Sequence, residues 1–164
     1  PLFKSNMVHL LRNFAEDRGC GHASAVLRPE EQRLDGLHVL LVEDNEINQE
    51  IAKELLLMEG ASVDVADNGE QALDIFARSE EGYYQLVLMD IQMPVMDGYT
   101  ATAALRSLRR DDAKTAIILA MTANVFSDDV IKAEASGMNG HISKPFDPDR
   151  LYAMIAASCH RKRG

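Results

Sequence analysis

The sequence is poor in cysteine, has no surplus of basic residues and lacks any long uninterrupted apolar run. Its two cysteines, Cys20 and Cys159, are too few and too far apart for a disulfide framework, and they suit a reducing, cytoplasmic setting. His22 lies beside Cys20, but two candidate ligands do not make a zinc site. No apolar run is long enough for a signal peptide or a transmembrane helix, so we expect no direct membrane contact from this chain and assign any membrane anchor to other parts of a longer parent protein.

The charge of the chain is acidic and unevenly distributed. The 164 residues include 17 Lys and Arg against 26 Asp and Glu, which gives a formal net charge of −9. Residues 1–36 hold five basic and five acidic residues, so the whole excess lies in residues 37–164. Because nucleic-acid binding needs a basic face, we expect no nucleic-acid partner, and we interpret residues 160–164 as a solvated basic tail.

Apolar runs alternate with helical patterns from Leu37 onward. Five runs have the composition of strands: Leu37–Val42, Ala61–Ala66, Leu86–Met89, Ala116–Met121 and Gly140–Ser143. Five segments have the apolar spacing of helices: Glu46–Glu59, Glu70–Arg78, Gly98–Arg110, Ser127–Ser136 and Pro148–Ser158. Gly60 and Gly137 are expected C-caps, and Asp97 is an expected N-cap. The pattern predicts an α/β fold, a flavodoxin-like doubly wound five-stranded parallel sheet of order 2-1-3-4-5 with five helices.

Polar residues follow the strands at their carboxyl ends, where sheets of this type bind ligands. Glu43 and Asp44 follow the first strand, Asp90 the third, Thr122 the fourth and Lys144 the fifth. Because parallel strands end at one edge of the sheet, we expect these five side chains to converge. Three close carboxylates repel one another and need a cation, and oxygen ligands favour Mg²⁺ (or Mn²⁺). With an ammonium and a hydroxyl beside them, the predicted chemistry is phosphoryl transfer to a carboxylate.

Four segments carry a more specific signal. They are "LLVEDNEINQE" at 40–50, "LVLMDIQMPVMDGYTAT" at 86–102, "ILAMTAN" at 118–124 and "ISKPF" at 142–146. In order and spacing they resemble the receiver domain of two-component response regulators, and most closely the C-terminal receiver of a hybrid sensor histidine kinase. The resemblance runs from about Leu37 to Ser158, and we place the receiver domain at residues 37–159.

The resemblance implies a role for each matching residue. Asp90 would be the phosphoacceptor, and Glu43, Asp44 and the backbone carbonyl of Gln92 would join it in holding Mg²⁺. Thr122 would be the switch hydroxyl, Lys144 the phosphoryl-binding lysine and Lys144-Pro145 a cis peptide that aims this lysine.

The function implied by the resemblance is phosphorelay signal transduction. Asp90 would accept a phosphoryl group from a phosphohistidine on a histidine kinase domain or a histidine phosphotransfer protein. The domain would then switch conformation or pass the group on to another histidine. It would catalyse its own phosphotransfer and dephosphorylation, within a parent chain that we expect to be a hybrid histidine kinase.

One position departs from the family pattern. Many members carry Tyr or Phe three residues before the lysine, and this chain has His141. His141 either follows Thr122 inward as a switch residue or is an exposed histidine without a role, and the sequence leaves both readings open.

Ile47 is a candidate contact for a partner. It lies at the edge of the apolar face of its predicted helix, so we expect it to be partly exposed. In the receivers that this chain resembles, the histidine-bearing partner packs over this helix and the loop after the last strand. We therefore expect Ile47, Pro145 and Phe146 to form an apolar ring around the phosphorylation site.

Three other functions fit these residues less well. A receiver-like interaction module without phosphorylation fits poorly, because the set of site residues is intact. A phosphatase of the haloacid dehalogenase type would need a second Asp two residues after Asp90, where this chain has Gln92. Flavodoxin-like cofactor binding would need a Gly- or Thr-rich phosphate loop after the first strand, and none is present.

Residues 1–36 need a separate interpretation. Residues 1–14 align without gaps with residues 145–158, and their apolar positions coincide. We interpret residues 1–14 as an amphipathic helix that is the tail of a preceding receiver-like domain, with an unrelated amphipathic helix as the alternative. Residues 15–36, polar and low in aromatic residues, would then be a linker. Because the chain begins with Pro rather than Met, we expect a longer parent protein.

Overall fold

The computed structural model describes residues 34–123 and 127–160. The expected helix at 1–14, all but the end of the expected linker and the residues beyond 160 lie outside the described residues. Five strands are present: β1 His38–Val42, β2 Ser62–Ala66, β3 Leu86–Asp90, β4 Ile117–Thr122 and β5 Gly140–Ser143. They form one parallel sheet in the order β2-β1-β3-β4-β5, which confirms the predicted topology.

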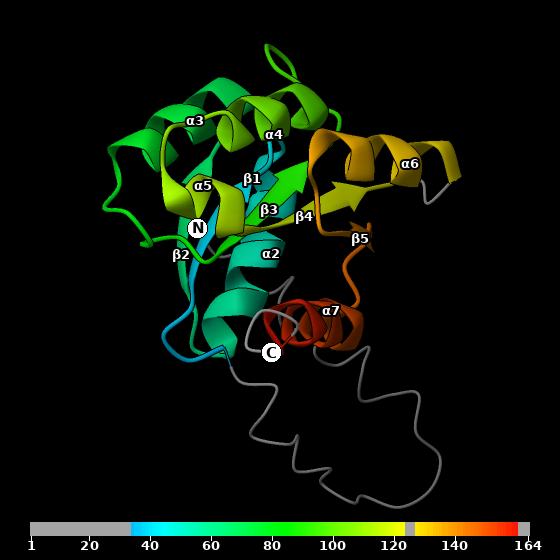
Figure 1. Ribbon diagram of the computed structural model, residues 1–164. Helices are drawn as coiled ribbons and strands as arrows, with labels where there is room; N and C mark the ends of the chain where they lie inside the picture. The colour runs from blue at the N-terminus through cyan, green and yellow to red at the C-terminus, as the bar shows by residue number, and fades with distance from the viewer. Residues whose placement is uncertain (1–33, 124–126, 161–164) are drawn as a thin grey trace, which may run out of the picture. The chain divides into compact units, whose positions relative to one another are not determined.

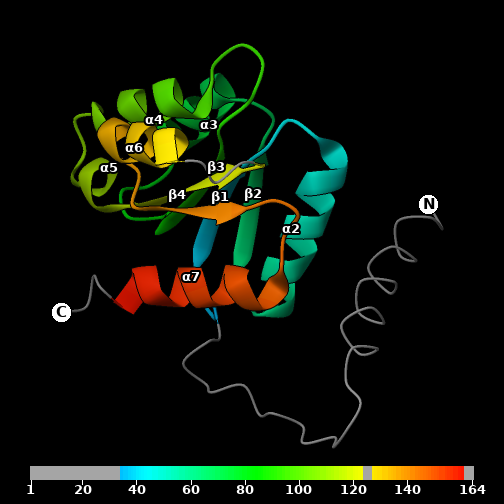
Figure 2. The same ribbon diagram turned by 90° about the vertical axis from the view of Figure 1, so that its right-hand side faces the viewer.

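Helices cover both faces of this sheet. Those in the described part of the chain are α2 Glu46–Met58, α3 Gly69–Arg78, α4 Gly98–Arg106, α5 Asp111–Thr115, α6 Ser127–Ser136 and α7 Pro148–His160. Helices α2 and α7 lie on one face and α3, α4, α5 and α6 on the other, as the two views of the ribbon show (Figures 1 and 2). Each face has its own apolar core, one including Phe76 and Leu105 and the other Leu56 and Leu151. Every residue of β3 and β4 is buried between these layers, which explains why their sequences are continuous apolar runs.

The ends of the helices follow the expected cap chemistry. Asn45 caps α2, where its side chain accepts hydrogen bonds from the N–H groups of the first turn. Asp97 caps α4 and accepts from the N–H of Thr100 at 2.7 Å, as predicted. Gly60 and Gly137 have φ angles of 91° and 101° after α2 and α6, a left-handed conformation that glycine adopts without strain.

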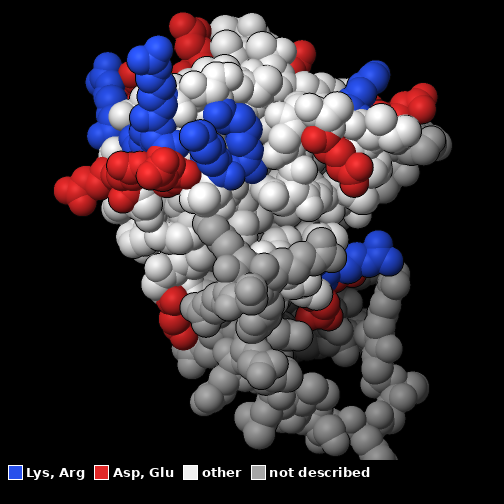
Figure 3. Space-filling model, viewed as in Figure 1, with Lys and Arg blue, Asp and Glu red and all other residues white. Residues whose placement is uncertain are grey.

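The surface around α3 and α5 carries charges of both signs. Figure 3 shows Lys and Arg side chains beside Asp and Glu side chains on this part of the face in view. Exposed charged residues at or near the ends of α3 and α5 include Arg78, Glu80, Glu81, Arg109 and Lys114. On this part of the face the basic side chains lie next to one another, with acidic side chains below them and at the upper edge (Figure 3).

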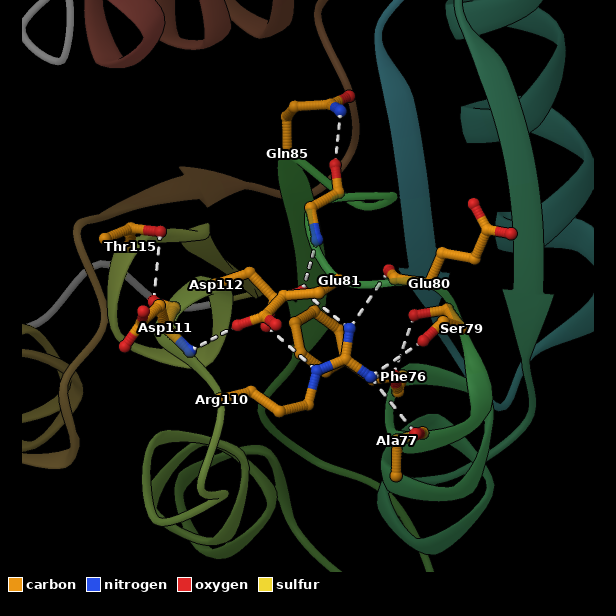
Figure 4. A network of polar contacts seen from close by, with 11 residues as sticks. Phe76, Ala77, Ser79, Glu80, Glu81, Gln85, Arg110, Asp111, Asp112 and Thr115 are labelled. Carbon is orange, nitrogen blue, oxygen red and sulfur yellow. Dashed lines mark hydrogen bonds and ion pairs between the residues drawn. The ribbon is translucent and has the colours of Figure 1, made fainter.

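The prediction of a single helix over Gly98–Arg110 is wrong. Helix α4 ends at Arg106, and the separate helix α5 begins at Asp111, so the described residues contain one helix more than the five expected. Arg110 has an extended backbone, and its guanidinium donates hydrogen bonds to main-chain carbonyls at the end of α3, among them Phe76 and Ser79 at 2.8 and 2.9 Å (Figure 4). It also pairs with Asp112 at 2.7 Å. These bonds satisfy the main-chain carbonyls at the end of α3. They hold Arg110 outside a helical conformation, so α4 does not continue to this residue.

The folded unit begins before the first strand. Leu34 is buried, and its N–H donates to the carbonyl of Glu59 at the end of α2. The last residues of the stretch predicted as a linker therefore pack against the domain.

Candidate functional site

The residues singled out by the sequence surround one open cavity at the carboxyl edge of the sheet. Glu43 and Asp44 follow β1, Asp90 ends β3, Thr122 ends β4 and Lys144 follows β5. These four strands are neighbours in the sheet, so short stretches far apart in sequence reach the same place. The cavity has a volume of about 240 Å³, and all five residues line it. It is completed by Asn45, Asn48, Ile91, Gln92, Met121 and Ala123.

The three acids of the cavity form a compact cluster. Glu43 and Asp90 are 1% and 4% exposed, whereas Asp44 is open to solvent. One carboxylate oxygen from each of the three lies within 4.8 Å of the other two. None of the described residues that line the cavity is His or Cys, and the clustered ligand atoms are carboxylate oxygens. This donor set fits a hard divalent cation such as Mg²⁺, which prefers one or two carboxylates together with water.

Lys144 joins the two buried acids. Its ammonium donates to Glu43 Oε2 at 2.5 Å and lies 3.2 Å from Asp90 Oδ1. Its main-chain N–H donates to the carbonyl of Thr122 at 2.8 Å, which continues the pairing of β4 and β5 beyond the end of β5. The Lys144-Pro145 peptide is cis, as the resemblance implied. The lysine thus supplies a fixed positive charge between two carboxylates that would otherwise repel each other.

The surroundings of Asp90 shift the pKa of its carboxyl group. Burial and the negative charge of Glu43 raise the pKa of Asp90 to about 6, although Lys144 and the N–H of Gln92 act in the opposite direction. The Gln92 N–H donates to Asp90 Oδ1 at 3.3 Å. Near neutral pH the group is therefore charged but readily protonated, and a bound cation would hold it in the charged form that a nucleophile needs.

The loop after Asp90 returns close to its main chain. The N–H of Gly98 donates to the carbonyl of Ile91 at 3.0 Å. A Cβ added at Gly98 would lie 2.2 Å from the main-chain oxygen of Asp90, so only glycine allows this approach. Gly98 therefore fixes the backbone that carries the candidate phosphoacceptor.

The two candidate switch residues lie on neighbouring strands. Thr122 is buried at the end of β4 and lines the cavity, opposite Ser143 in the strand register. His141 pairs with Ala120, is half-buried and does not line the cavity. In this structure the imidazole is therefore outside the site that Thr122 faces.

The residues expected to contact a partner differ in their exposure. Ile47 is 57% exposed on the first turn of α2, and Pro145 is exposed. Phe146 is half-buried and packs against the core on the α2 and α7 face, so less of its ring is available than the sequence suggested. The sequence reasoning missed Val95, which is 77% exposed in the loop between β3 and α4 and has a φ of 70°. A left-handed backbone is unfavourable for a β-branched residue, and no sequence signal pointed to it.

The sequence reasoning also missed two amides that contact Glu43. Asn48 Nδ2 lies 3.4 Å from Glu43 Oε1, and Gln49 Nε2 donates to the main-chain oxygen of Glu43 at 2.6 Å. Their positions one turn into α2 were the available signal, because side chains there point back toward the residue that precedes the helix.

Comparisons with known proteins agree with this geometry. The family model of the response regulator receiver domain matches residues 39–156. Probable histidine kinase 2 of Oryza sativa subsp. indica is 38% identical over 157 residues, covering 87% of this chain and 15% of that protein. The osmosensing histidine protein kinase SLN1 of Saccharomyces cerevisiae is 31% identical over 163 residues, covering 96% of this chain and 13% of SLN1. The chain thus spans less than a fifth of these curated relatives.

Two solved structures are similar in fold and sequence. The receiver domain of the sensor histidine kinase PA1611 from Pseudomonas aeruginosa PAO1, which has a magnesium ion coordinated in its active site cleft, aligns with a TM-score of 0.68 and 33% identity over 76% of this chain and 98% of that domain. The second is a co-crystal structure from Saccharomyces cerevisiae of the histidine phosphotransfer protein Ypd1 and the receiver domain of its downstream response regulator Ssk1. The matching chain of this structure aligns with a TM-score of 0.68 and 31% identity, over 77% of this chain and 91% of the matching chain.

Among the residues that the structure describes, no helix combines the length and the apolar character that crossing a membrane requires.

The family match covers most of the chain, and Glu43, Asp44, Asp90 and Lys144 all lie within the matched residues 39–156. The chain therefore belongs to the response regulator receiver domain family, the receiver module of two-component phosphorelays.

Proposed function

We propose that this chain accepts a phosphoryl group on Asp90 from a phosphohistidine. The observation that carries the proposal is the arrangement of Asp90, which is buried beside Glu43 and Lys144 but lines an open cavity of about 240 Å³. The carboxylate is reachable, and it has a positive charge beside it at 3.2 Å. A phosphoryl donor needs both conditions, because the incoming group is anionic and must approach in line with the attacking oxygen.

The chemistry of the step follows from these side chains. An oxygen of Asp90 attacks phosphorus, the P–N bond to the donor imidazole breaks, and a P–O bond forms to give an acyl phosphate. Lys144 stabilises the negative charge of the transferring oxygens, and the Thr122 hydroxyl supplies a further donor. Mg²⁺ (or Mn²⁺), held by Glu43, Asp44, Asp90 and the backbone carbonyl of Gln92, would neutralise charge in the cluster.

The product would act as a switch or as a relay intermediate. An acyl phosphate on Asp90 attracts the Thr122 hydroxyl, and we propose that His141 moves toward the space that Thr122 leaves. Alternatively, the phosphoryl group passes to a second histidine. The family match supports neither an unphosphorylated module, nor a haloacid dehalogenase-type phosphatase, nor flavodoxin-like cofactor binding.

We also propose that the chain is part of a hybrid histidine kinase. The relatives from Oryza sativa and Saccharomyces cerevisiae are histidine kinases, and their similarity extends beyond residues 39–156. As part of this proposal, residues 1–14 would be the tail of a preceding receiver-like domain and residues 15–36 a linker. The partners would be a histidine kinase domain or a histidine phosphotransfer protein, in the cytoplasm, with no nucleic acid.

The transfer itself provides the test. The full chain is mixed with phosphorylated histidine phosphotransfer proteins, beginning with Ypd1, and the label on each protein is followed with time in Mg²⁺. We expect the label to move to the chain and to be absent from the Asp90→Asn variant. Label that moves equally to Asp90→Asn would contradict the assignment of Asp90, and label that never leaves any donor would contradict the proposed donor class.

The partner would dock over the first turn of α2. Ile47 and Val95 are strongly exposed apolar residues on segments that continue directly from the cavity-lining residues Asp44 and Gln92. With Pro145 and the accessible part of Phe146, they would exclude water from the transferring group. The likeness to a receiver solved with Ypd1 supports this class of partner.

Docking is separable from chemistry by comparing donors. Ile47→Arg should slow transfer from a phosphohistidine protein about tenfold, or about 1.4 kcal/mol, and leave labelling by acetyl phosphate unchanged. Met58→Arg is the matched control, because Met58 is 51% exposed at the opposite end of the same helix. Equal slowing with both donors would mean damage to the site, and unchanged transfer would remove Ile47 from the docking surface.

A further inference from the structure

Glu43 has hydrogen-bond partners on both its main chain and its carboxylate, and three of them come from the segment that follows it. Its N–H donates to the carbonyl of Ala66, which continues the pairing of β1 and β2 by one residue. Its main-chain oxygen, however, accepts from a side chain, Gln49 Nε2, at 2.6 Å. Its carboxylate Oε1 accepts from the Asn45 N–H at 3.2 Å and faces Asn48 Nδ2 at 3.4 Å. The first turn of α2 thus folds back over the residue that precedes it.

Gln49 ties this residue to the neighbouring strand. The same Nε2 that contacts Glu43 donates to Asp67 Oδ1 at 2.9 Å, just after β2. The N–H of Asp67 in turn donates to Gln71 Oε1 at 2.6 Å in the first turn of α3. A chain of amide contacts therefore fixes the backbone at the carboxyl ends of β1 and β2 together.

The two oxygens of the Glu43 carboxylate have different surroundings. Oε1 faces neutral amide donors, and Oε2 accepts from the ammonium of Lys144 at 2.5 Å. Asn48 lines the cavity beside Asp44 and Asp90, and Glu43 itself is 1% exposed. The neutral donors belong to Asn45 and Asn48 at the start of α2, whereas the ammonium belongs to Lys144 after β5. A cation held by Glu43 would therefore compete with Lys144 for Oε2.

We propose that Asn48 and Gln49 are positioning residues for the cation site, with Asn48 fixing the rotation of the Glu43 carboxylate and Gln49 fixing its main chain. The proposal rests on the proposed function, in which Glu43 holds Mg²⁺. A carboxylate that is already oriented loses less freedom when it binds a cation, and groups that hydrogen-bond to a ligand from behind commonly change metal affinity. Neither amide needs to contact the cation itself.

The test measures Mg²⁺ affinity by calorimetry or by NMR shifts of the full chain, together with the melting temperature in a chelator. Asn48→Ala should weaken Mg²⁺ binding about tenfold. Its melting temperature without metal should not fall, because alanine favours a helix more than asparagine does. Gln49→Leu should also weaken binding. Gln71→Leu is the matched control, since it removes an amide of the same network that does not touch Glu43, and its affinity should equal that of the wild type.

Each outcome has one meaning. Wild type that binds no Mg²⁺ would overturn the proposed function itself. Wild type that binds while Asn48→Ala binds equally well would overturn the positioning role of Asn48. Loss of affinity in Gln71→Leu as well, or loss that parallels a lower melting temperature, would show general loosening of the loop and would also overturn the inference.

Discussion

Replacing Lys144 by methionine should tighten divalent-cation binding while it destabilises the metal-free protein. The ammonium lies 2.5 Å from Glu43 Oε2 and 3.2 Å from Asp90 Oδ1, so it occupies the same carboxylates that would hold Mg²⁺. Methionine keeps much of the aliphatic stem and removes the charge. The variant therefore isolates the electrostatic competition between lysine and cation for two buried acids.

The size of the effect follows from the distances. An ammonium this close to the carboxylate oxygens would lie within about 5 Å of a cation bound to them, given Mg–O distances of about 2.1 Å. Even with the screening of bulk water, removing one positive charge at that range favours a divalent ion by about 1.5–2 kcal/mol, or about 10- to 30-fold in affinity. Without metal, Glu43 and Asp90 lose their counter-ion, which should lower stability by about 1–3 kcal/mol in this partly solvated site.

Calorimetric titration with Mg²⁺ at about pH 8 measures this most cleanly, because removing Lys144 also raises the pKa of Asp90 further and lets protons compete at lower pH. Lys132→Met, an exposed lysine on α6, controls for the change in net charge. Melting curves with a chelator and with saturating Mg²⁺ complete the assay. An unchanged or weaker affinity in Lys144→Met would refute the reasoning, since the lysine would then not compete for the carboxylates.

Three further predictions concern stability. The pKa of Asp90 in the folded protein, about 6, lies above its unfolded value, so the metal-free protein should gain stability as pH falls from about 6 to about 4. Melting curves should show no such gain in saturating Mg²⁺ or in Asp90→Asn. The same pH dependence of the melting temperature in all three would contradict the raised pKa. Gly98→Ala should cost about 2–3 kcal/mol in chemical denaturation and slow the labelling of Asp90, because its Cβ would meet the Asp90 backbone; wild-type behaviour would mean that the loop yields easily. Arg106→Met should cost about 2–4 kcal/mol, because Arg106 donates to the carbonyls of Ala113, Ala116 and Gly137 and to Asn139 Oδ1; a smaller loss would show that water replaces these bonds.

The sheet and the location of the site were predictable because both depend on local pattern and topology. The runs at Leu86–Met89 and Ala116–Met121 are apolar throughout, which indicates strands buried on both faces. Once five parallel strands are expected, the residues after them must gather at one edge, and the cavity indeed contains Asp90, Thr122 and Lys144.

The errors arise where tertiary contacts decide local structure. Nothing in the sequence from Ser107 to Lys114 stops a helix strongly, and α4 ends because Arg110 finds carbonyl acceptors at the end of α3, more than thirty residues earlier in the chain. The exposure of Val95 and the partial burial of Phe146 likewise depend on how the loops pack against the rest of the domain. Such contacts have no local sequence signature.

The most direct test of the account is the Mg²⁺-dependent phosphorylation of Asp90 by a small donor. The full chain is incubated with acetyl phosphate in Mg²⁺ or in a chelator, and its intact mass is measured beside that of Asp90→Asn. We predict that the wild type gains the mass of one phosphoryl group only in Mg²⁺, and that Asp90→Asn gains none, because the clustered acids repel the donor without a cation and the variant lacks the nucleophile. A mass gain that persists in Asp90→Asn, or that is equal in the chelator, would contradict the central claim.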